Sequence, residues 1–228
     1  MSEHLSKQFD LDLESVRTHI LEMGALVEQQ LSRAIEAFGN GNLDLMQQVI
    51  IGDQQVNQME IDIGAECIRI IAKRQPTAGD LRLVVAISRI VTDLERMGDK
   101  ASKVARMSRK LYESQRMHLP KLAEVRHCGE LAVQMLRKAL DSLARMDAVA
   151  AQSILAEDAV IDEEFNAIMR QVITYMMEDA RTISEALDII WIAKSLERVG
   201  DHATNIAESV IYIVSGQDIR HTNGKERT

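Results

Sequence analysis

The chain has 228 residues, a formal net charge of −8 and a hydrophobic content of 46%. The acidic balance argues against direct nucleic-acid binding, because phosphate contacts need a basic surface, and an aromatic content of 3% leaves few side chains for base stacking. The two cysteines, Cys67 and Cys128, form no CxxC pair and indicate inert thiols in a reducing compartment. No apolar secretory segment and no membrane-spanning window is evident. We therefore expect a cytoplasmic protein that reaches a membrane only through its partners.

The composition favours helix, with many Ala, Leu, Ile, Met, Glu, Gln and Arg residues and only two prolines. Apolar residues at three- and four-residue steps predict a first helix over residues 7–38, which the sequence GNGN at 39–42 ends. A second helix is predicted over 43–73. The sequence RQPTAGD follows it, and a third helix is predicted over 79–115.

The sequence RMHLPK at residues 116–121 predicts a boundary between two units. Three more helices are predicted after it, ending at residue 146, spanning 148–178, and ending at residue 215. Short loops make sequential helices antiparallel neighbours. The sequence thus predicts an all-α fold of two tandem, pseudo-symmetric three-helix bundles, at 1–118 and 119–217, with a polar tail at 218–228.

A six-residue motif occurs in both predicted bundles. Residues 94–99 read LERMGD and residues 196–201 read LERVGD, so five of six letters match at an offset of 102 residues. A self-match at such a long period indicates an internal repeat. Both copies also place a glycine, Gly98 and Gly200, inside a helix, where glycine costs roughly 1 kcal/mol relative to alanine. A glycine there suits close approach of another helix or of a ligand.

The carboxylates of the motif have helical spacing. Glu95 and Asp99 are four residues apart, as are Glu197 and Asp201, so each pair lies on one face of its helix. Paired carboxylates repel unless a cation lies between them, and their hard oxygens suit Mg, Mn, Ca or Fe. The alternative is a set of solvated charges paired with the neighbouring arginines.

The preceding helix of each bundle adds further oxygen ligands. Asp53-x-x-x-Asn57 and Asp158-x-x-x-Asp162 occupy corresponding positions, and His202 and Asn205 are weaker candidates beside the second motif. The hypothesis is that each bundle binds divalent or ferric ions. The predicted metal ligands are Asp53, Glu95, Asp99, Asp158, Asp162, Glu197 and Asp201.

No catalytic residue is predicted. A ferritin-like di-iron site needs two inward Glu-x-x-His pairs, and the chain offers one, Glu124-x-x-His127, which is expected on a solvated face. No Gly-rich phosphate loop, HExxH motif or nucleophile elbow occurs. Two alternatives stay open: a metal-dependent helical-bundle enzyme, and a purely structural adaptor whose carboxylates bind no metal.

The two motifs, the longer stretch LERVGDHATNIAE and the loop sequence IIAKRQPTAGDLR together resemble the PhoU family over nearly the whole chain. The resemblance implies two PhoU-type three-helix bundles, often in a homodimer, and a cytoplasmic negative regulator of the phosphate-starvation response. It implies two partners, the ATPase subunit of a phosphate ABC transporter and a phosphate-sensing histidine kinase.

The resemblance also implies a metal cofactor, because family members bind iron or zinc clusters, or Mg or Mn, at Glu/Asp-x-x-x-Asp motifs. That role falls on Glu95, Asp99, Glu197 and Asp201, and the pair on the fifth helix also fits the pattern. Asn57 departs from it.

Overall fold

The computed structural model describes residues 2–113 and 123–220, with side chains from residue 7 onward. Within these residues the chain forms helices and no strand, which confirms the predicted all-α class. None of these helices is long and apolar enough to cross a membrane. The elements are α1 (Ser2–Asn40), α2 (Leu43–Arg74), α3 (Ala78–Glu113), α4 (Ala123–Arg145), α5 (Ala148–Ile154), α6 (Asp158–Glu178), the 3-10 turn η1 (Ala180–Thr182) and α7 (Ile183–Ser215).

The chain turns between α1 and α2 inside the predicted breaker at residues 39–42. Helix α1 ends two residues later than predicted. Helix α1 continues through Gly39 to Asn40, and the chain turns at Gly41, whose φ of 67° lies in the left-handed region that favours glycine. The Asn42 side chain then accepts a hydrogen bond of 3.0 Å from the Leu45 amide and caps α2.

The predicted fifth helix over 148–178 is wrong in one respect, because the structure breaks it into α5 and α6. Around the break, the Glu157 amide bonds the Ile154 carbonyl and the Val160 amide bonds the Glu157 carbonyl, both at 3.0 Å. These bonds reach back three residues, not four, and tighten the chain into a turn. The Lys138 ammonium of α4 lies 2.6 Å from the Glu157 carboxylate at this turn. No glycine or proline marks the break in the sequence.

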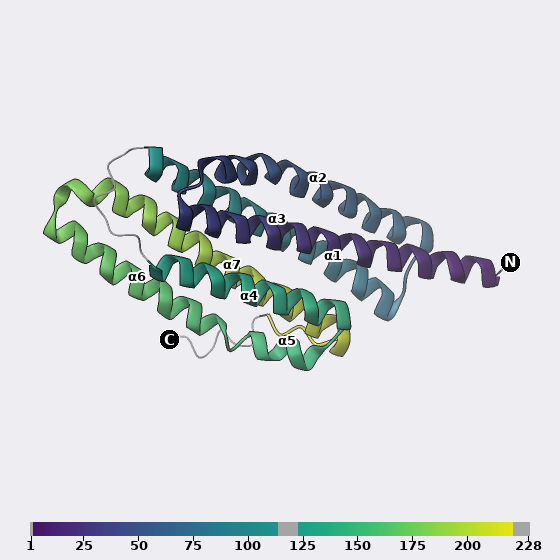
Figure 1. Ribbon diagram of the computed structural model, residues 1–228. Coiled ribbons are helices and arrows are strands. Elements are labelled where there is room, and N and C mark those ends of the chain that lie inside the picture. Colours follow the sequence, from purple (N-terminus) through teal and green to yellow (C-terminus); the bar gives the residue numbers. More distant parts are fainter. Residues whose placement is uncertain (1, 114–122, 221–228) are drawn as a thin grey trace.

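The two halves of the chain pack as two helical bundles with one shared apolar core (Figure 1). Helices α1, α2 and α3 form the first bundle, and α4, α5, α6 and α7 form the second. Helices α3 and α7 make the most extensive contact between the halves. They run antiparallel, because Arg82 near the start of α3 bonds the Ile213 carbonyl near the end of α7, while Lys110 near the end of α3 pairs with Asp188 near the start of α7.

The apolar stripe predicted for α3 is confirmed. Ile87, Leu94 and Met97 are fully buried, whereas Glu95 is half-buried and Asp99 exposed. The carboxylates therefore stand at the border of the core, as the helical spacing predicts. The predicted division after residue 118 lies outside the described residues, as does the tail beyond residue 220, so those boundaries stay predictions.

Candidate functional site

In the first bundle, α2 brings its carboxylate to the motif glycine of α3. A Cβ atom placed on Gly98 would lie 3.0 Å from Val56 Cγ1 and 3.5 Å from Asp53 Oδ1. Only glycine therefore allows α2 to lie this close to α3 without a shift of Val56. This contact sets the register that brings Asp53 to the level of Glu95 and Asp99.

The second bundle repeats this contact between α6 and α7. A Cβ on Gly200 would lie 3.0 Å from Ile161 Cδ1 and 3.6 Å from Asp158 Oδ1. The two halves therefore use the same element pair in the same register: glycine against an apolar side chain and an aspartate. The register between two helices cannot be obtained from periodicity alone. Here the contacts at Gly98 and Gly200 show that Asp53 and Asp158 occupy equivalent positions in the two bundles.

The carboxylates of the first bundle act on one another electrostatically. Burial raises the pKa of Asp53, and the neighbouring Asp99 raises it further. Burial also raises the pKa of Glu95, with additional contributions from Asp99, Glu60 and Asp53. A carboxylate held near others resists ionisation. We call Asp53, Glu60, Glu95 and Asp99 the first carboxylate cluster.

The second bundle contains a corresponding cluster. Burial raises the pKa of Asp201, and Glu197 and Asp158 raise it further. These three residues, with Asp162 one turn beyond Asp158, make up the second carboxylate cluster. Asp162 is half-buried on α6.

Basic side chains border the second cluster, as the solvated-charge alternative predicts in part. Lys194 Nζ lies 2.5 Å from Glu197 Oε1, and Arg198 NH1 lies 3.5 Å from Asp201 Oδ2. Both cations lower the pKa of Asp201, but burial, Glu197 and Asp158 raise it by more. The second cluster is thus neither fully neutralised nor fully solvated.

Glu60 is a member of the first cluster that sequence reasoning missed. It follows Asp53 by seven residues, which places it two turns further along the same face of α2. Its repeat-equivalent in α6 is Phe165, whereas Asn57 is the equivalent of Asp162. Each cluster therefore has four carboxylates. The fourth is Glu60 in the first bundle and Asp162 in the second, and their positions along the helix differ by about one turn. The seven-residue spacing from Asp53 to Glu60 is the feature of the sequence that could have identified Glu60 as a member of the cluster.

The fit of these clusters to a metal ion is partial. Among residues 2–113 and 123–220, no three His, Cys, Asp or Glu side chains are already arranged to hold a metal ion. Three oxygens of the clusters and their surroundings, on Asp53, Asn57 and Glu197, are nevertheless buried without a hydrogen-bond partner. Buried unpaired oxygens are costly and call for a ligand. The donor chemistry fits a hard cation.

His202 and Asn205 do not take part in the second cluster, contrary to their prediction as weaker candidates. His202 Nδ1 lies 2.9 Å from Asp93 Oδ1, and Asn205 Nδ2 donates a 3.0 Å hydrogen bond to the same oxygen. Both side chains face α3 and not α6. His202 and Asp93 are each nine-tenths buried, so they join the two bundles inside the molecule.

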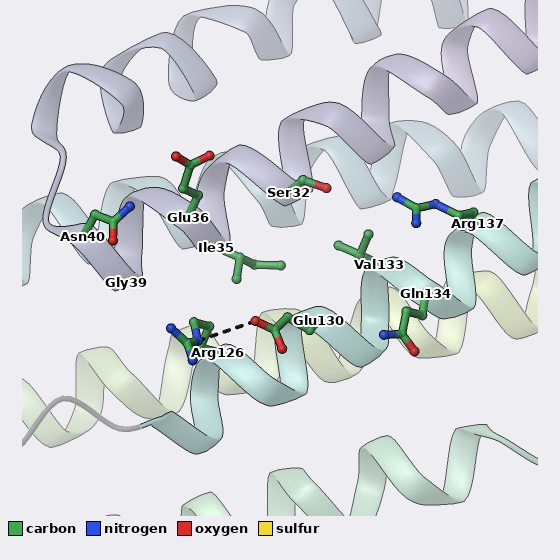
Figure 2. A pocket seen from close by; sticks show the side chains of 10 residues that line it. All are labelled: Ser32, Ile35, Glu36, Gly39, Asn40, Arg126, Glu130, Val133, Gln134 and Arg137. Carbon is green, nitrogen blue, oxygen red and sulfur yellow. Dashed lines mark ion pairs between the residues drawn. The ribbon is translucent and has the colours of Figure 1, made fainter.

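A groove between α1 and α4 lies apart from both clusters (Figure 2). Ile35 and Val133 are the apolar residues of its lining, and the Arg126–Glu130 ion pair of 3.5 Å lies along α4. None of the predicted metal ligands lines it. Glu124 and His127 are exposed, which confirms that this Glu-x-x-His pair belongs to a solvated face.

A family model of the PhoU domain matches the chain twice, over residues 20–108 and 125–210. The chain belongs to the PhoU family. The two PhoU matches correspond to the two halves of the internal repeat, and each contains one copy of the Leu-Glu-Arg-x-Gly-Asp motif.

Similarity to related proteins covers nearly the entire chain. It is 50% identical over 224 residues to the phosphate-specific transport system accessory protein PhoU homolog of Pseudomonas aeruginosa, covering 97% of this chain and 91% of that protein. It is 48% identical over 226 residues to the phosphate-specific transport system accessory protein PhoU of Escherichia coli strain K12, covering 99% of this chain and 93% of that protein.

Two crystal structures share the fold. PhoU from Pseudomonas aeruginosa superposes with a TM-score of 0.88 at 50% identity, covering 92% of this chain and 100% of that chain. The phosphate transport system regulatory protein PhoU from Streptococcus pneumoniae superposes with a TM-score of 0.84 at 29% identity, covering 92% of this chain and 98% of that chain. They confirm the predicted PhoU-like, pseudo-symmetric helical bundle.

Proposed function

We propose that this protein is a regulator of phosphate transport and a negative regulator of the phosphate-starvation response. The observation that carries the proposal is the match along nearly the whole chain to accessory proteins of the phosphate-specific transport system, at 50% and 48% identity. The Streptococcus pneumoniae protein of the same fold is named a regulatory protein. The proposed role needs no catalysis, so the chain is proposed not to be an enzyme.

The proposed mechanism is that of a cytoplasmic adaptor, acting as a homodimer. It binds one state of the phosphate ABC transporter through the ATPase subunit and transmits that state to a phosphate-sensing histidine kinase. A binding protein shifts such an equilibrium only by as much as it prefers one state over another. When phosphate is plentiful, the bound kinase is held in the silencing state.

The carboxylate clusters are proposed to hold metal ions in this adaptor. Their oxygen-only donor set suits Mg²⁺, Mn²⁺ or Fe³⁺ better than Zn²⁺, which favours nitrogen and sulfur ligands. Burial and, after it, neighbouring carboxylates raise the pKa values of Asp53, Glu95 and Asp201, and a bound cation would offset both effects by stabilising the ionised forms. The chain's own residues would then orient the ion at the border of the core, where a partner can reach it.

Deletion of the gene followed by complementation tests the regulatory proposal. A phosphate-starvation reporter should stay silent in phosphate-rich medium in the parent strain and become active in the deletion strain. Wild-type complementation should silence it again. A reporter that stays silent in the deletion strain contradicts the proposal and leaves the enzyme alternative.

A further inference from the structure

Helix α7 exposes an apolar stripe at its amino-terminal half. Ile183, Leu187 and Trp191 follow one another at four-residue steps, so they lie along one edge of the helix. Their exposed fractions are 43%, 47% and 50%. Single exposed apolar residues are common on protein surfaces, but three adjacent ones that include a tryptophan are typical of binding surfaces. We call these three residues the α7 stripe.

Cationic side chains of α3 border the α7 stripe. Lys103 Nζ lies 4.3 Å from the centroid of the Trp191 ring. Further along the same seam, Lys110 Nζ lies 2.8 Å from Asp188 Oδ1 and keeps 64% of its side chain exposed. Two lysines therefore line the α7 stripe on a chain whose formal net charge is −8; Asp188 already pairs with Lys110, so Lys103 supplies most of the positive charge of this border. This border complements an acidic partner.

The internal repeat shows that the fold does not require a tryptophan in the α7 stripe. The α3 positions equivalent to Ile183, Leu187 and Trp191 are Leu81, Val85 and Arg89, so the repeat is apolar at the first two positions and charged at the third. The Arg89 guanidinium lies 5.5 Å from the ring centroid of Tyr212, and a cavity of about 580 Å³ with several polar lining residues is found there. The two ends of the seam thus differ where Trp191 stands on α7 and Arg89 stands on α3. Stability of the seam alone gives no reason for an exposed tryptophan.

We propose that the α7 stripe is the docking surface for an amphipathic helix of a protein partner, with acidic residues on both sides of that helix's apolar face. Apolar residues of the partner, spaced to match Ile183, Leu187 and Trp191, pack on the stripe. Its carboxylates pair with Lys103 and Lys110 and set the orientation. The inference rests on the proposed function in so far as an adaptor needs a partner surface.

Trp191 allows a direct test, because it is the single tryptophan of the chain. The full-length protein is titrated with three synthetic peptides that lack tryptophan and are about 18 residues, or five helical turns, long. The first has a leucine stripe bordered by glutamates. The second has the same stripe bordered by lysines, and the third is a scrambled version of the first. Emission of Trp191 reports whether its exposed half becomes covered.

The expected result is saturable binding of the glutamate peptide with a shift of Trp191 emission to shorter wavelength. Binding of the lysine peptide should be at least tenfold weaker, and the scrambled peptide should give no shift. Added salt should weaken the glutamate peptide, since exposed charges are screened. Leu187→Gln and Lys110→Gln should each weaken binding at least fivefold. Arg89→Gln, at the repeat-equivalent of Trp191, is the matched control and should leave binding unchanged.

Three results would overturn the proposal. Absence of a saturable emission shift would show that the α7 stripe is not a docking surface. Equal binding of the glutamate and lysine peptides would show that the contact is apolar and does not select an acidic partner. A sedimentation experiment gives the third: if Leu187→Gln dissociates an oligomer of the wild-type chain, the stripe is covered by a second copy. None of these readouts depends on phosphate regulation, so failure of the reporter experiment above would be a separate result.

Discussion

Asp93 of α3 and His202 of α7 form a buried link between the two bundles, with 2.9 Å between Asp93 Oδ1 and His202 Nδ1. The amide of Asn205 donates to the same oxygen at 3.0 Å. The repeat-equivalents of these three residues are Ser195, Lys100 and Lys103, so the link is not duplicated. It lies near the middle of the seam between α3 and α7, between the Arg82–Ile213 contact at one end and the Lys110–Asp188 ion pair at the other.

Removal of Asp93 should destabilise the protein, because the buried His202 and the half-buried Asn205 would lose their acceptor. We expect Asp93→Ala to lower the free energy of unfolding by about 1–3 kcal/mol, measured by urea denaturation. Asp141→Ala is the control, since Asp141 forms an exposed ion pair with Arg145 within α4, and should change stability by at most about 0.5 kcal/mol. Equal losses in the two variants would show that the buried link contributes nothing particular.

The motif glycines should respond differently to alanine. In Gly98→Ala the new Cβ would meet Val56 Cγ1 at 3.0 Å, and Val56 is fully buried and stiff at χ1. In Gly200→Ala it would meet Cδ1 at the flexible end of Ile161, also at 3.0 Å. Alanine gains about 1 kcal/mol of helix propensity against an overpacking loss of about 1–3 kcal/mol. We expect Gly98→Ala to be clearly the more destabilising of the two.

Gly64→Ala provides the control for the glycine comparison. Gly64 lies inside α2 with nothing within 4 Å of an added Cβ, so alanine should stabilise the protein by about 1 kcal/mol through helix propensity alone. Thermal denaturation of the three variants gives the order. Stabilisation by Gly98→Ala equal to that by Gly64→Ala would contradict the close contact between α2 and α3.

Neutralising the first cluster should stabilise the metal-free protein. Glu95→Gln together with Asp99→Asn removes the Asp99 charge, which raises the pKa values of both Asp53 and Glu95, and also the half-buried Glu95 charge itself. In chelator at pH 7 we expect a higher Tm, by about 2–4 °C for each kcal/mol of repulsion removed. Addition of Mn²⁺ should raise the Tm of the wild type by more than that of the variant. A lower Tm of the variant in chelator would contradict mutual repulsion in this cluster.

The raised pKa values of the two clusters, caused first by burial and then by neighbouring carboxylates, predict a pH dependence of stability. Asp53, Glu95 and Asp201 have pKa values above their usual range, so the folded protein binds more protons than the unfolded chain between the usual and the raised values. These groups therefore lower stability as pH rises through that window. The stability advantage of an Asp53→Asn, Glu95→Gln, Asp201→Asn variant in chelator should shrink as pH falls from 7 to about 4. A stability advantage that does not change with pH would show that it arises from packing and not from the raised pKa values.

Much of the fold could be predicted because helical periodicity is a local property. The stripe through Ile87, Leu94 and Met97 places each of these residues in the core, and the repeated motif identifies the two halves. The break at residues 155–157 could not be predicted, since those residues favour helix and the turn depends on bonds to Ile154 and an ion pair with Lys138.

The candidate site could be predicted only in part, because it depends on the register between helices. Spacing within a helix pairs Glu95 with Asp99 and Glu197 with Asp201, but only the contacts at the two motif glycines show which α2 and α6 residues join them. His202 illustrates the limit: its neighbour in the chain is Asp201, yet its side chain binds Asp93 on the other bundle.

The most direct test of the proposed metal site is the metal content of protein purified without a metal-binding tag, measured by mass spectrometry. Wild type is compared with a variant carrying Glu95→Gln, Asp99→Asn, Glu197→Gln and Asp201→Asn, after circular dichroism shows that both are folded. We predict bound Mg, Mn or Fe in the wild type and its loss in the variant. Absence of metal from both proteins, even after incubation with Mn²⁺ or Fe³⁺, would contradict the metal site and leave the carboxylates as a docking surface.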